Sequence, residues 1–175
     1  MEHTLSSKRI YEGRILNLRV DEVEVSRNGR HAKREVVEHG EAVAILARDS
    51  EGCFLFVRQY RYPIASELLE IPAGIMEAGE TPVQSAAREL REETGYRAEQ
   101  WTHLSSIWTT PGFSNEKIYL FFAEKLVWDP LSPDEDEDIS LTRLTEDEAR
   151  ALFLRSEAQD AKTLAALGWY FASKA

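Results

Sequence analysis

Three glutamates, Glu89, Glu92 and Glu93, are spaced so that a single helix would carry all of them close together. Glu89 and Glu93 are four positions apart, and like charges at this spacing cost an isolated helix about 0.2–0.5 kcal/mol. A divalent cation bound to the carboxylates would offset this cost, because hard cations prefer oxygen ligands. The pattern therefore predicts a metal site. The alternative is a solvated charged face, and the charges alone do not decide between the two.

The boundaries of this helix follow from its flanking residues. Thr81 is a favourable N-cap, and Gln84 completes a capping box with it. Gly95 suits the left-handed position that ends a helix, so we expect a helix over residues 82–94. Its glutamates are expected to lie away from the apolar stripe that faces the core. That stripe is expected to consist of Val83, Ala86, Ala87 and Leu90.

Composition limits the possible partners. The chain has 175 residues, of which 43% are hydrophobic, and a net charge of −10. This is enough for one domain with a core, and it argues against binding to nucleic acid or anionic membranes. A small phosphorylated ligand remains compatible, since local arginines and metals can reverse the field at one site.

Cys53 is the only cysteine, so no intramolecular disulfide is expected. Without an apolar run of about 18 residues or a signal-peptide pattern, we expect a cytoplasmic protein.

The remaining pattern consists mainly of short strands. Asn28-Gly29 predicts a hairpin between the run ending at Val25 and residues 33–37. Helices are expected from a capping box at Thr145 to about Leu154, and after a possible cap at Asp160. Strands on both sides of a central helix, with two helices at the end, favour a layered α/β/α arrangement. The other expected strands are residues 42–47, 54–57, 102–108, 118–123 and 139–144.

The spacing around the glutamates is similar to the Nudix box. Its fixed positions here are Gly74, Glu80, Arg88, Glu89, Leu90, Glu92, Glu93 and Gly95, with Tyr96 departing from the usual aliphatic residue. The resemblance implies an α+β Nudix fold, in which a mixed sheet lies between helices. Residues 1–40 would then be an antiparallel β extension that serves dimerisation, and residues 41–175 the Nudix hydrolase domain. A homodimer is implied by the same resemblance.

Beyond the box, the chain resembles the ADP-ribose pyrophosphatase branch over nearly its whole length. Pro111 lies sixteen residues after Gly95, which is the spacing of that branch. The resemblance implies metal-dependent hydrolysis of ADP-ribose to AMP and ribose 5-phosphate. The other matching pieces are Arg58–Arg61, Leu69–Gly74, Pro111–Ser114, the acidic run 134–138 and Asp160–Thr163.

The resemblance also assigns the metal ligands. Glu89 and Glu93 would be the principal ligands, with support from Glu92 and the main-chain carbonyl of Ala73. Oxygen ligands of this kind suit Mg²⁺ or Mn²⁺. The box positions Gly74, Glu80, Arg88 and Gly95 would have structural roles, with Glu80 and Arg88 bracing the loop and helix.

Substrate contacts are implied in the same way. Arg61 and Arg34 would meet the diphosphate or ribose, although Arg34 could instead be a solvated hairpin charge. Glu70 would accept a hydrogen bond from the adenine amino group or act as an ion-pair partner. Ile75 and Thr110 would border the sugar. Gly112 and Phe113, in the turn after the box, complete the expected substrate contacts.

The acidic run implies a general base. Glu137 aligns best with that role and Glu135 is the alternative, since Asp138 departs from the apolar residue usual at its position. Hydrolysis of GDP-mannose or another nucleotide sugar is the nearest alternative activity, and an NADH preference fits less well. A Nudix-fold module that senses nucleotides without catalysis is the alternative from a different class.

Overall fold

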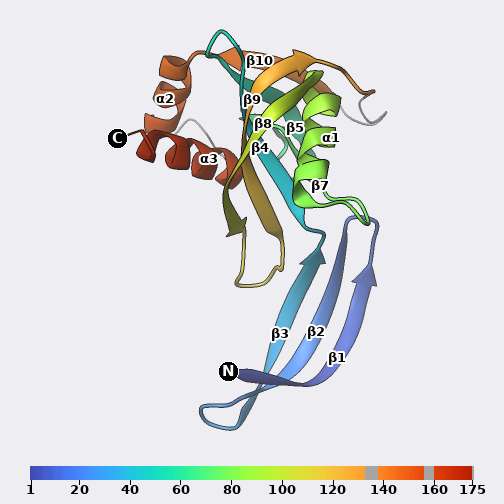
Figure 1. Cartoon of the computed structure of the whole chain (residues 1–175). Helices are drawn as coiled ribbons and strands as arrows, with labels where there is room; N and C mark the ends of the chain where they lie inside the picture. Colours follow the sequence, from blue (N-terminus) through green and yellow to red (C-terminus); the bar gives the residue numbers. More distant parts are fainter. Residues whose placement is uncertain (133–137, 156–159, 175) are drawn as a thin grey trace. The chain divides into compact units, whose positions relative to one another are not determined.

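The computed structural model of the chain describes residues 1–132, 138–155 and 160–174. The chain forms two compact units. Figure 1 colours the chain along its sequence, from blue at the N-terminus to red at the C-terminus. We call Met1–Glu41 together with Trp108–Lys117 the N-terminal unit, and Ala42–Ile107 together with Ile118–Ala175 the sandwich unit.

The N-terminal unit is built on a three-stranded antiparallel sheet. Its strands are β1 (Glu2–Glu12), β2 (Leu16–Val25) and β3 (Arg30–His39), in the order β1-β2-β3. The predicted hairpin at Asn28-Gly29 is confirmed, because Gly29 has a φ of 64° between β2 and β3. This left-handed conformation is the one that glycine adopts without steric cost.

A segment from much later in the sequence completes the N-terminal unit. The Val37 amide donates to the Phe113 carbonyl at 2.8 Å, and the His39 amide donates to the Asn115 side-chain oxygen, also at 2.8 Å. Val37 and Ser114 additionally form a parallel bridge. The turn after residue 108 is therefore held by β3 through main-chain bonds.

A mixed seven-stranded sheet forms the centre of the sandwich unit. Its order is β10-β5-β4-β9-β8, with β6 paired to β5 and β7 paired to β4. The β4–β9 pair is parallel and the β4–β5 pair antiparallel, as expected for a mixed sheet. The strands are β4 (Ala42–Arg48), β5 (Phe54–Arg61), β6 (Ser66–Glu70), β7 (Ala73–Ile75), β8 (Tyr96–Trp108), β9 (Lys117–Trp128) and β10 (Ile139–Leu144).

Helices cover both faces of this sheet, as Figure 1 shows. They are α1 (Pro82–Thr94) on one face and α2 (Glu146–Leu154) with α3 (Ala161–Ala172) on the other, while Tyr62–Ile64 form a 3₁₀ turn. Alternate residues of β4 pack into two core clusters, one on each face of the sheet. The α3 cluster contains Ala42, Ala44 and Leu46, and the α1 cluster contains Val43, Ile45 and Ala47. The predicted α/β/α arrangement is confirmed.

The predicted boundaries of α1 are also confirmed. The Gln84 side-chain oxygen accepts a hydrogen bond from the Thr81 amide at 2.9 Å, as in a capping box. At the other end Gly95 has a φ of 79°, and its amide donates to the Arg91 carbonyl at 3.0 Å. The box helix is thus defined by its own caps before any packing is considered.

The buried side of α1 differs from the prediction. Ala86 and Leu90 lie in the core as expected, but Val83 is 41% exposed. Glu89 and Glu93 were expected away from the core-facing side, yet each is only 9% exposed. The helix is rotated so that these two carboxylates lie on the packed side, which apolar periodicity alone cannot indicate.

The strands differ from the predictions as well, since β5 extends to Arg61 and β9 to Trp128. β8 begins at Tyr96 rather than near residue 102, because Gly95 turns the chain directly from α1 into the sheet. The three-residue strand β7 was not predicted, since a segment of that length carries no periodicity. Its pairing with β4 brings the start of the box onto the central strand.

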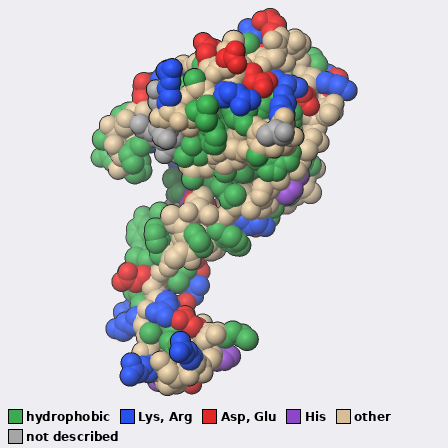
Figure 2. Space-filling model, turned by 90° about the vertical axis from the view of Figure 1, so that its left-hand side faces the viewer, with side chains coloured by type: hydrophobic (Ala, Val, Ile, Leu, Met, Phe, Trp, Pro, Cys, Tyr) green, Lys and Arg blue, Asp and Glu red, His purple; other side chains and the backbone are tan. Residues whose placement is uncertain are grey.

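The surface has mixed charge. Lys and Arg side chains are interspersed with Asp and Glu side chains on the face of the sandwich unit that Figure 2 shows. Among the described residues, no helix is long and apolar enough to cross a membrane.

A substitution at Gly95 tests the close packing at the end of α1. A Cβ on Gly95 would lie 2.4 Å from the Trp128 ring, and the positive φ adds strain. We expect Gly95→Ala to lower the free energy of unfolding by about 2–4 kcal/mol. Gly52→Ala is the matched control, because Gly52 has a φ of 85° and nothing within 4 Å of a new Cβ. Its expected cost is about 1 kcal/mol. Equal losses in urea unfolding would contradict the packing argument.

Candidate metal and substrate site

Two glutamates of α1 lie directly against the main chain of β7. A Cβ on Gly74 would lie 2.1 Å from the carboxyl carbon of Glu89, so only glycine leaves room for that carboxylate. The Ala73 amide donates to Glu93 Oε2 at 3.2 Å. The fold therefore brings together Glu89, Glu93 and the Ala73–Gly74 main chain, and their role as metal ligands stays a prediction.

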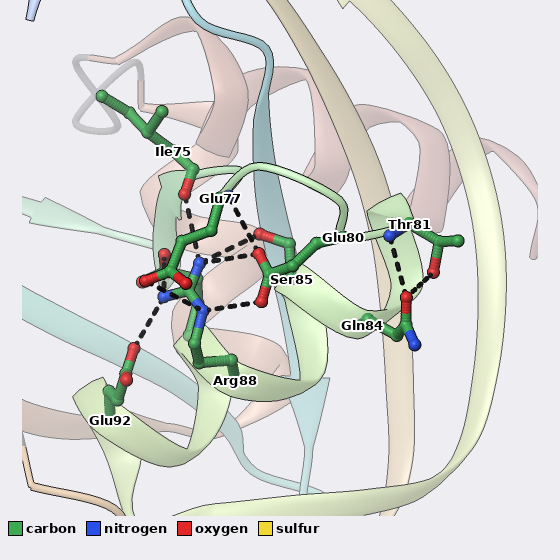
Figure 3. Close-up of polar contacts among 9 residues, drawn as sticks. Ile75, Glu77, Glu80, Thr81, Gln84, Ser85, Arg88 and Glu92 are labelled. Carbon is green, nitrogen blue, oxygen red and sulfur yellow. Dashed lines mark hydrogen bonds and ion pairs between the residues drawn. The ribbon is translucent and has the colours of Figure 1, made fainter.

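Arg88 is the central cation of this region (Figure 3). Its Nη1 atom donates both to Glu89 Oε1 at 2.7 Å and to Glu92 Oε2 at 2.9 Å. The other side of the guanidinium bonds both oxygens of Glu80, at 2.9 and 3.0 Å, and the Ile75 carbonyl at 3.2 Å. Arg88 thus joins the loop that carries Glu80 to the helix that carries the other glutamates.

The donor set suits a hard divalent cation. Glu89, Glu92 and Glu93 offer only carboxylate oxygens, and the Glu89 carboxylate lies against the main chain at Gly74. Within residues 1–132, 138–155 and 160–174, however, no three Asp, Glu, His or Cys side chains are arranged as a metal cluster. Arg88 holds Glu89 and Glu92 in hydrogen bonds, so a cation would have to compete with its guanidinium for them.

Glu80 has a strongly altered acidity. The hydrogen bonds from Arg88 lower the pKa of Glu80 to about 2, against partial burial, which acts in the opposite direction. The Glu77 amide adds a further bond to Glu80 Oε2 at 3.0 Å. Glu80 is therefore ionised at neutral pH, where Arg88 is paired with it.

The lowered pKa of Glu80 predicts a stability that depends on pH. Its contribution is complete above the ordinary value of 4.5 and is lost as the pH falls towards about 2. We expect wild type to lose about 1–2 kcal/mol more than Glu80→Gln over this interval, after allowing for partial solvent screening. Urea unfolding at several pH values measures the difference. Parallel curves for the two proteins would show that the Arg88 pair does not contribute.

A second cluster of charges surrounds Glu70 at the end of β6. Arg61 donates to both oxygens of Glu70, from Nε at 3.0 Å and from Nη2 at 2.7 Å. Lys162 of α3 donates to the same carboxylate and, at 3.1 Å, to Asp160 Oδ1. The Glu70 side chain is only 2% exposed. The structure therefore places Glu70 in ion pairs, which was one of its two predicted roles, and its contact with adenine stays a prediction.

Electrostatics connects this cluster to the glutamate helix. Burial would raise the pKa of Glu70, but the hydrogen bonds of Arg61 and the charge of Lys162 outweigh it and lower that pKa. The bonds to Glu70 raise the pKa of Arg61, and the charges of Glu93 and Asp160 add to the shift. Arg61 thus lies within the field of Glu93, a predicted metal ligand.

The other predicted substrate residues are divided between the units. Ile75 is exposed in the sandwich unit, whereas Arg34 lies on β3 of the N-terminal unit and pairs with Glu2. In the same N-terminal unit, the Thr110 carbonyl accepts bonds from the Phe113 and Ser114 amides. These bonds form the predicted turn, in which Gly112 and Phe113 are exposed. Their contacts with substrate stay predictions.

Three further residues concern the predicted site: two candidate general bases, and a lysine to which the sequence assigned no role. Glu137 and Glu135, the candidate general bases, lie outside the described residues. Lys162 was noted only as part of a similar segment, without a role. Its partner Glu70 is 92 positions away in the sequence, so no spacing pattern could have indicated the contact.

Comparisons with known proteins bear on this geometry. A family model described as the NUDIX domain matches residues 38–167, and one described as the nucleoside diphosphate sugar hydrolase N-terminal domain matches residues 2–37. The chain is 40% identical over 168 residues to an ADP-ribose pyrophosphatase of Bacillus subtilis, covering 95% of this chain and 90% of the relative. It is 43% identical, with the same coverage, to a methanol dehydrogenase activator of Bacillus methanolicus.

A solved structure supports the fold. The crystal structure of an ADP compounds hydrolase superposes with a TM-score of 0.88, covering 98% of this chain and 93% of that one. Its sequence identity is 23%, so the likeness concerns the fold alone.

Proposed function

The chain belongs to the Nudix family, and we propose that it hydrolyses the pyrophosphate bond of ADP-ribose, with Mg²⁺ or Mn²⁺, to give AMP and ribose 5-phosphate. The observation that carries this proposal is the packing of Glu89 and Glu93 against the Ala73–Gly74 main chain. Relatives about 40% identical over most of the chain, among them an ADP-ribose pyrophosphatase, support the substrate.

Each element of the site has a part in this reaction. Glu89, Glu92, Glu93 and the Ala73 carbonyl would hold the cation, which supplies positive charge opposite the pyrophosphate and makes water more acidic. Gly74 leaves space for Glu89, and Arg88 keeps the carboxylates oriented along α1. Arg61 offers planar N–H donors to the diphosphate, which matters because the chain itself carries a net charge of −10.

The general base in this proposal is Glu137, which would take the proton of the attacking water. Loss of a general base typically lowers turnover by about 10²- to 10⁴-fold. We expect Glu137→Gln to show a fall of this size in kcat, with Glu135→Gln close to wild type. Steady-state assays of the two variants measure this. The reverse result would move the assignment to Glu135.

Substitution of Glu93 tests the metal site. Because a metal supplies several kcal/mol of transition-state stabilisation, we expect Glu93→Gln to lower kcat/KM at least about 100-fold. Chelation with EDTA should abolish wild-type activity, and Mg²⁺ should restore it. Glu99→Gln, at an exposed glutamate of β8 that pairs with Arg97, is the matched control. Wild-type activity in Glu93→Gln would refute the metal assignment.

The same assay distinguishes substrates. Release of AMP from ADP-ribose should exceed the turnover of GDP-mannose and of NADH when each is supplied with Mg²⁺. Faster turnover of GDP-mannose would replace the proposed substrate, because the fold of the family hosts several related activities.

The proposed assembly is a homodimer in which residues 1–40 serve dimerisation and residues 41–175 form the catalytic domain. Every residue of β1 is exposed within one chain, which leaves this strand available for a partner. Light scattering should give twice the 20.0 kDa of a single chain. A mass of one chain would refute this assembly.

A second candidate function is the activation of another enzyme. It is favoured by the 43% identical relative that is named a methanol dehydrogenase activator. Addition of the protein to a purified methanol dehydrogenase, with Glu93→Gln in parallel, tests it. Unchanged dehydrogenase activity would exclude this function.

A further inference from the structure

We propose that Lys162, at the start of α3, is a positioning residue that orients Arg61 for the substrate diphosphate through their shared partner Glu70. This inference rests on the proposed function, since it assigns the role of Lys162 in the same site. Lys162 does not itself touch the substrate in this assignment.

Lys162 stands where a lysine is locally unfavourable. It is the second residue of α3, and the positive end of the helix dipole disfavours a cation there. Its side chain is also only 12% exposed, so the ammonium group has lost most of its hydration. A residue that breaks a local rule in this way is expected to serve a site rather than the helix that carries it.

The contacts of Lys162 identify the site that it serves. Its ammonium group bonds Glu70 and Asp160, and the Asp160 oxygen that it contacts also accepts the Thr163 amide at 3.1 Å. The other oxygen, Asp160 Oδ2, is buried without a hydrogen-bond partner among the described residues. Thr163 is fully buried, and its hydroxyl accepts the Ile71 amide at 3.0 Å. The first turn of α3 is thus bonded both to the Glu70 carboxylate and to the main chain that follows it.

Glu70 in turn determines the plane of Arg61. The Nε and Nη2 atoms of Arg61 bond the two Glu70 oxygens in a bidentate pair, which holds the planar guanidinium in one orientation. The Arg61 side chain is 38% exposed, and among the described residues its Nη1 shows no hydrogen bond. The donors that face away from Glu70 are therefore available to a ligand.

Charge gives Lys162 a second effect on the same site. Arg61 and Lys162 balance Glu70 and Asp160, so this cluster of four side chains is neutral. Without Lys162 the cluster would have a net charge of −1 beside the position proposed for a diphosphate. Glu70 would depend on Arg61 alone for neutralisation, and Arg61 would be less available to the substrate. Both effects weaken substrate binding.

The test compares Lys162→Met with wild type in ADP-ribose hydrolysis. We expect KM to rise about tenfold with kcat within about threefold, since the chemical step uses other residues. Lys162→Arg should restore a KM near wild type because it keeps the cation. Lys174→Met is the matched control, since Lys174 follows the same helix and pairs with Glu146. A wild-type KM in folded Lys162→Met would overturn the inference.

A double-mutant cycle separates positioning from a structural role. If Lys162 acts mainly through Arg61, Lys162→Met should change KM by no more than about threefold in an Arg61→Met background, since only the effect of its charge remains there. A full tenfold change in that background would overturn the inference. If Lys162→Met does not unfold cooperatively, Lys162→Gln takes its place, with the same expected rise in KM.

Failure of the proposed function would look different. Wild type that hydrolyses GDP-mannose in place of ADP-ribose would refute the substrate, and the same comparison of KM would then test Lys162 on that diphosphate. Wild type inert towards every such substrate with Mg²⁺ would refute the function, and this inference with it. Active wild type with an unchanged KM in Lys162→Met and Lys162→Gln would refute the inference alone.

Discussion

A carboxylate removed from water must be neutralised, and this constraint organises the sandwich unit. Glu70, Glu89 and Glu93 are each at most 9% exposed. An unpaired buried charge would cost several kcal/mol, more than most single interactions contribute. Arg61 and Lys162 pair with Glu70, and Arg88 pairs with Glu89. Glu93 accepts a hydrogen bond from the Ala73 amide, which ties the start of β7 to α1.

The two charge clusters share a short piece of main chain. Glu70 ends β6, and three residues later the Ala73 amide bonds Glu93. Between them, the Ile45 amide of β4 donates to the Pro72 carbonyl at 2.8 Å, which ties this piece to the central strand. The segment is thus bonded to the sheet, to α1 and to α3. Its position is determined by partners on every side, as a site that must hold oxygen atoms within tenths of an ångström requires.

Much of this could be predicted from local sequence. The limits of α1 follow from Thr81, Gln84 and Gly95, and the buried strands β4 and β5 follow from continuous apolar runs. The glutamates of the site were found through their spacing along one helix. These features depend on neighbours within a few residues, which is the range over which capping and periodicity act.

What could not be predicted depends on contacts between distant segments. The rotation that buries Glu89 is set by its approach to Gly74, fifteen positions earlier, and by the packing of α1 on the sheet. Val83 was assigned to the core because it shares the apolar stripe, but the packed face extends towards Glu93 instead. The role of Lys162 depends on a partner in another layer of the fold. Periodicity describes one element at a time and carries no information about such contacts.

The return of residues 108–117 to the N-terminal unit has a consequence for any truncation of the chain. The chain passes between the two units at Glu41–Ala42, at Ile107–Trp108 and again at Lys117–Ile118. Deletion of the first forty residues would also strip the turn containing Gly112 and Phe113 of its main-chain partners on β3. The N-terminal sheet is thus not a detachable module, because a turn from the middle of the chain is bonded to it.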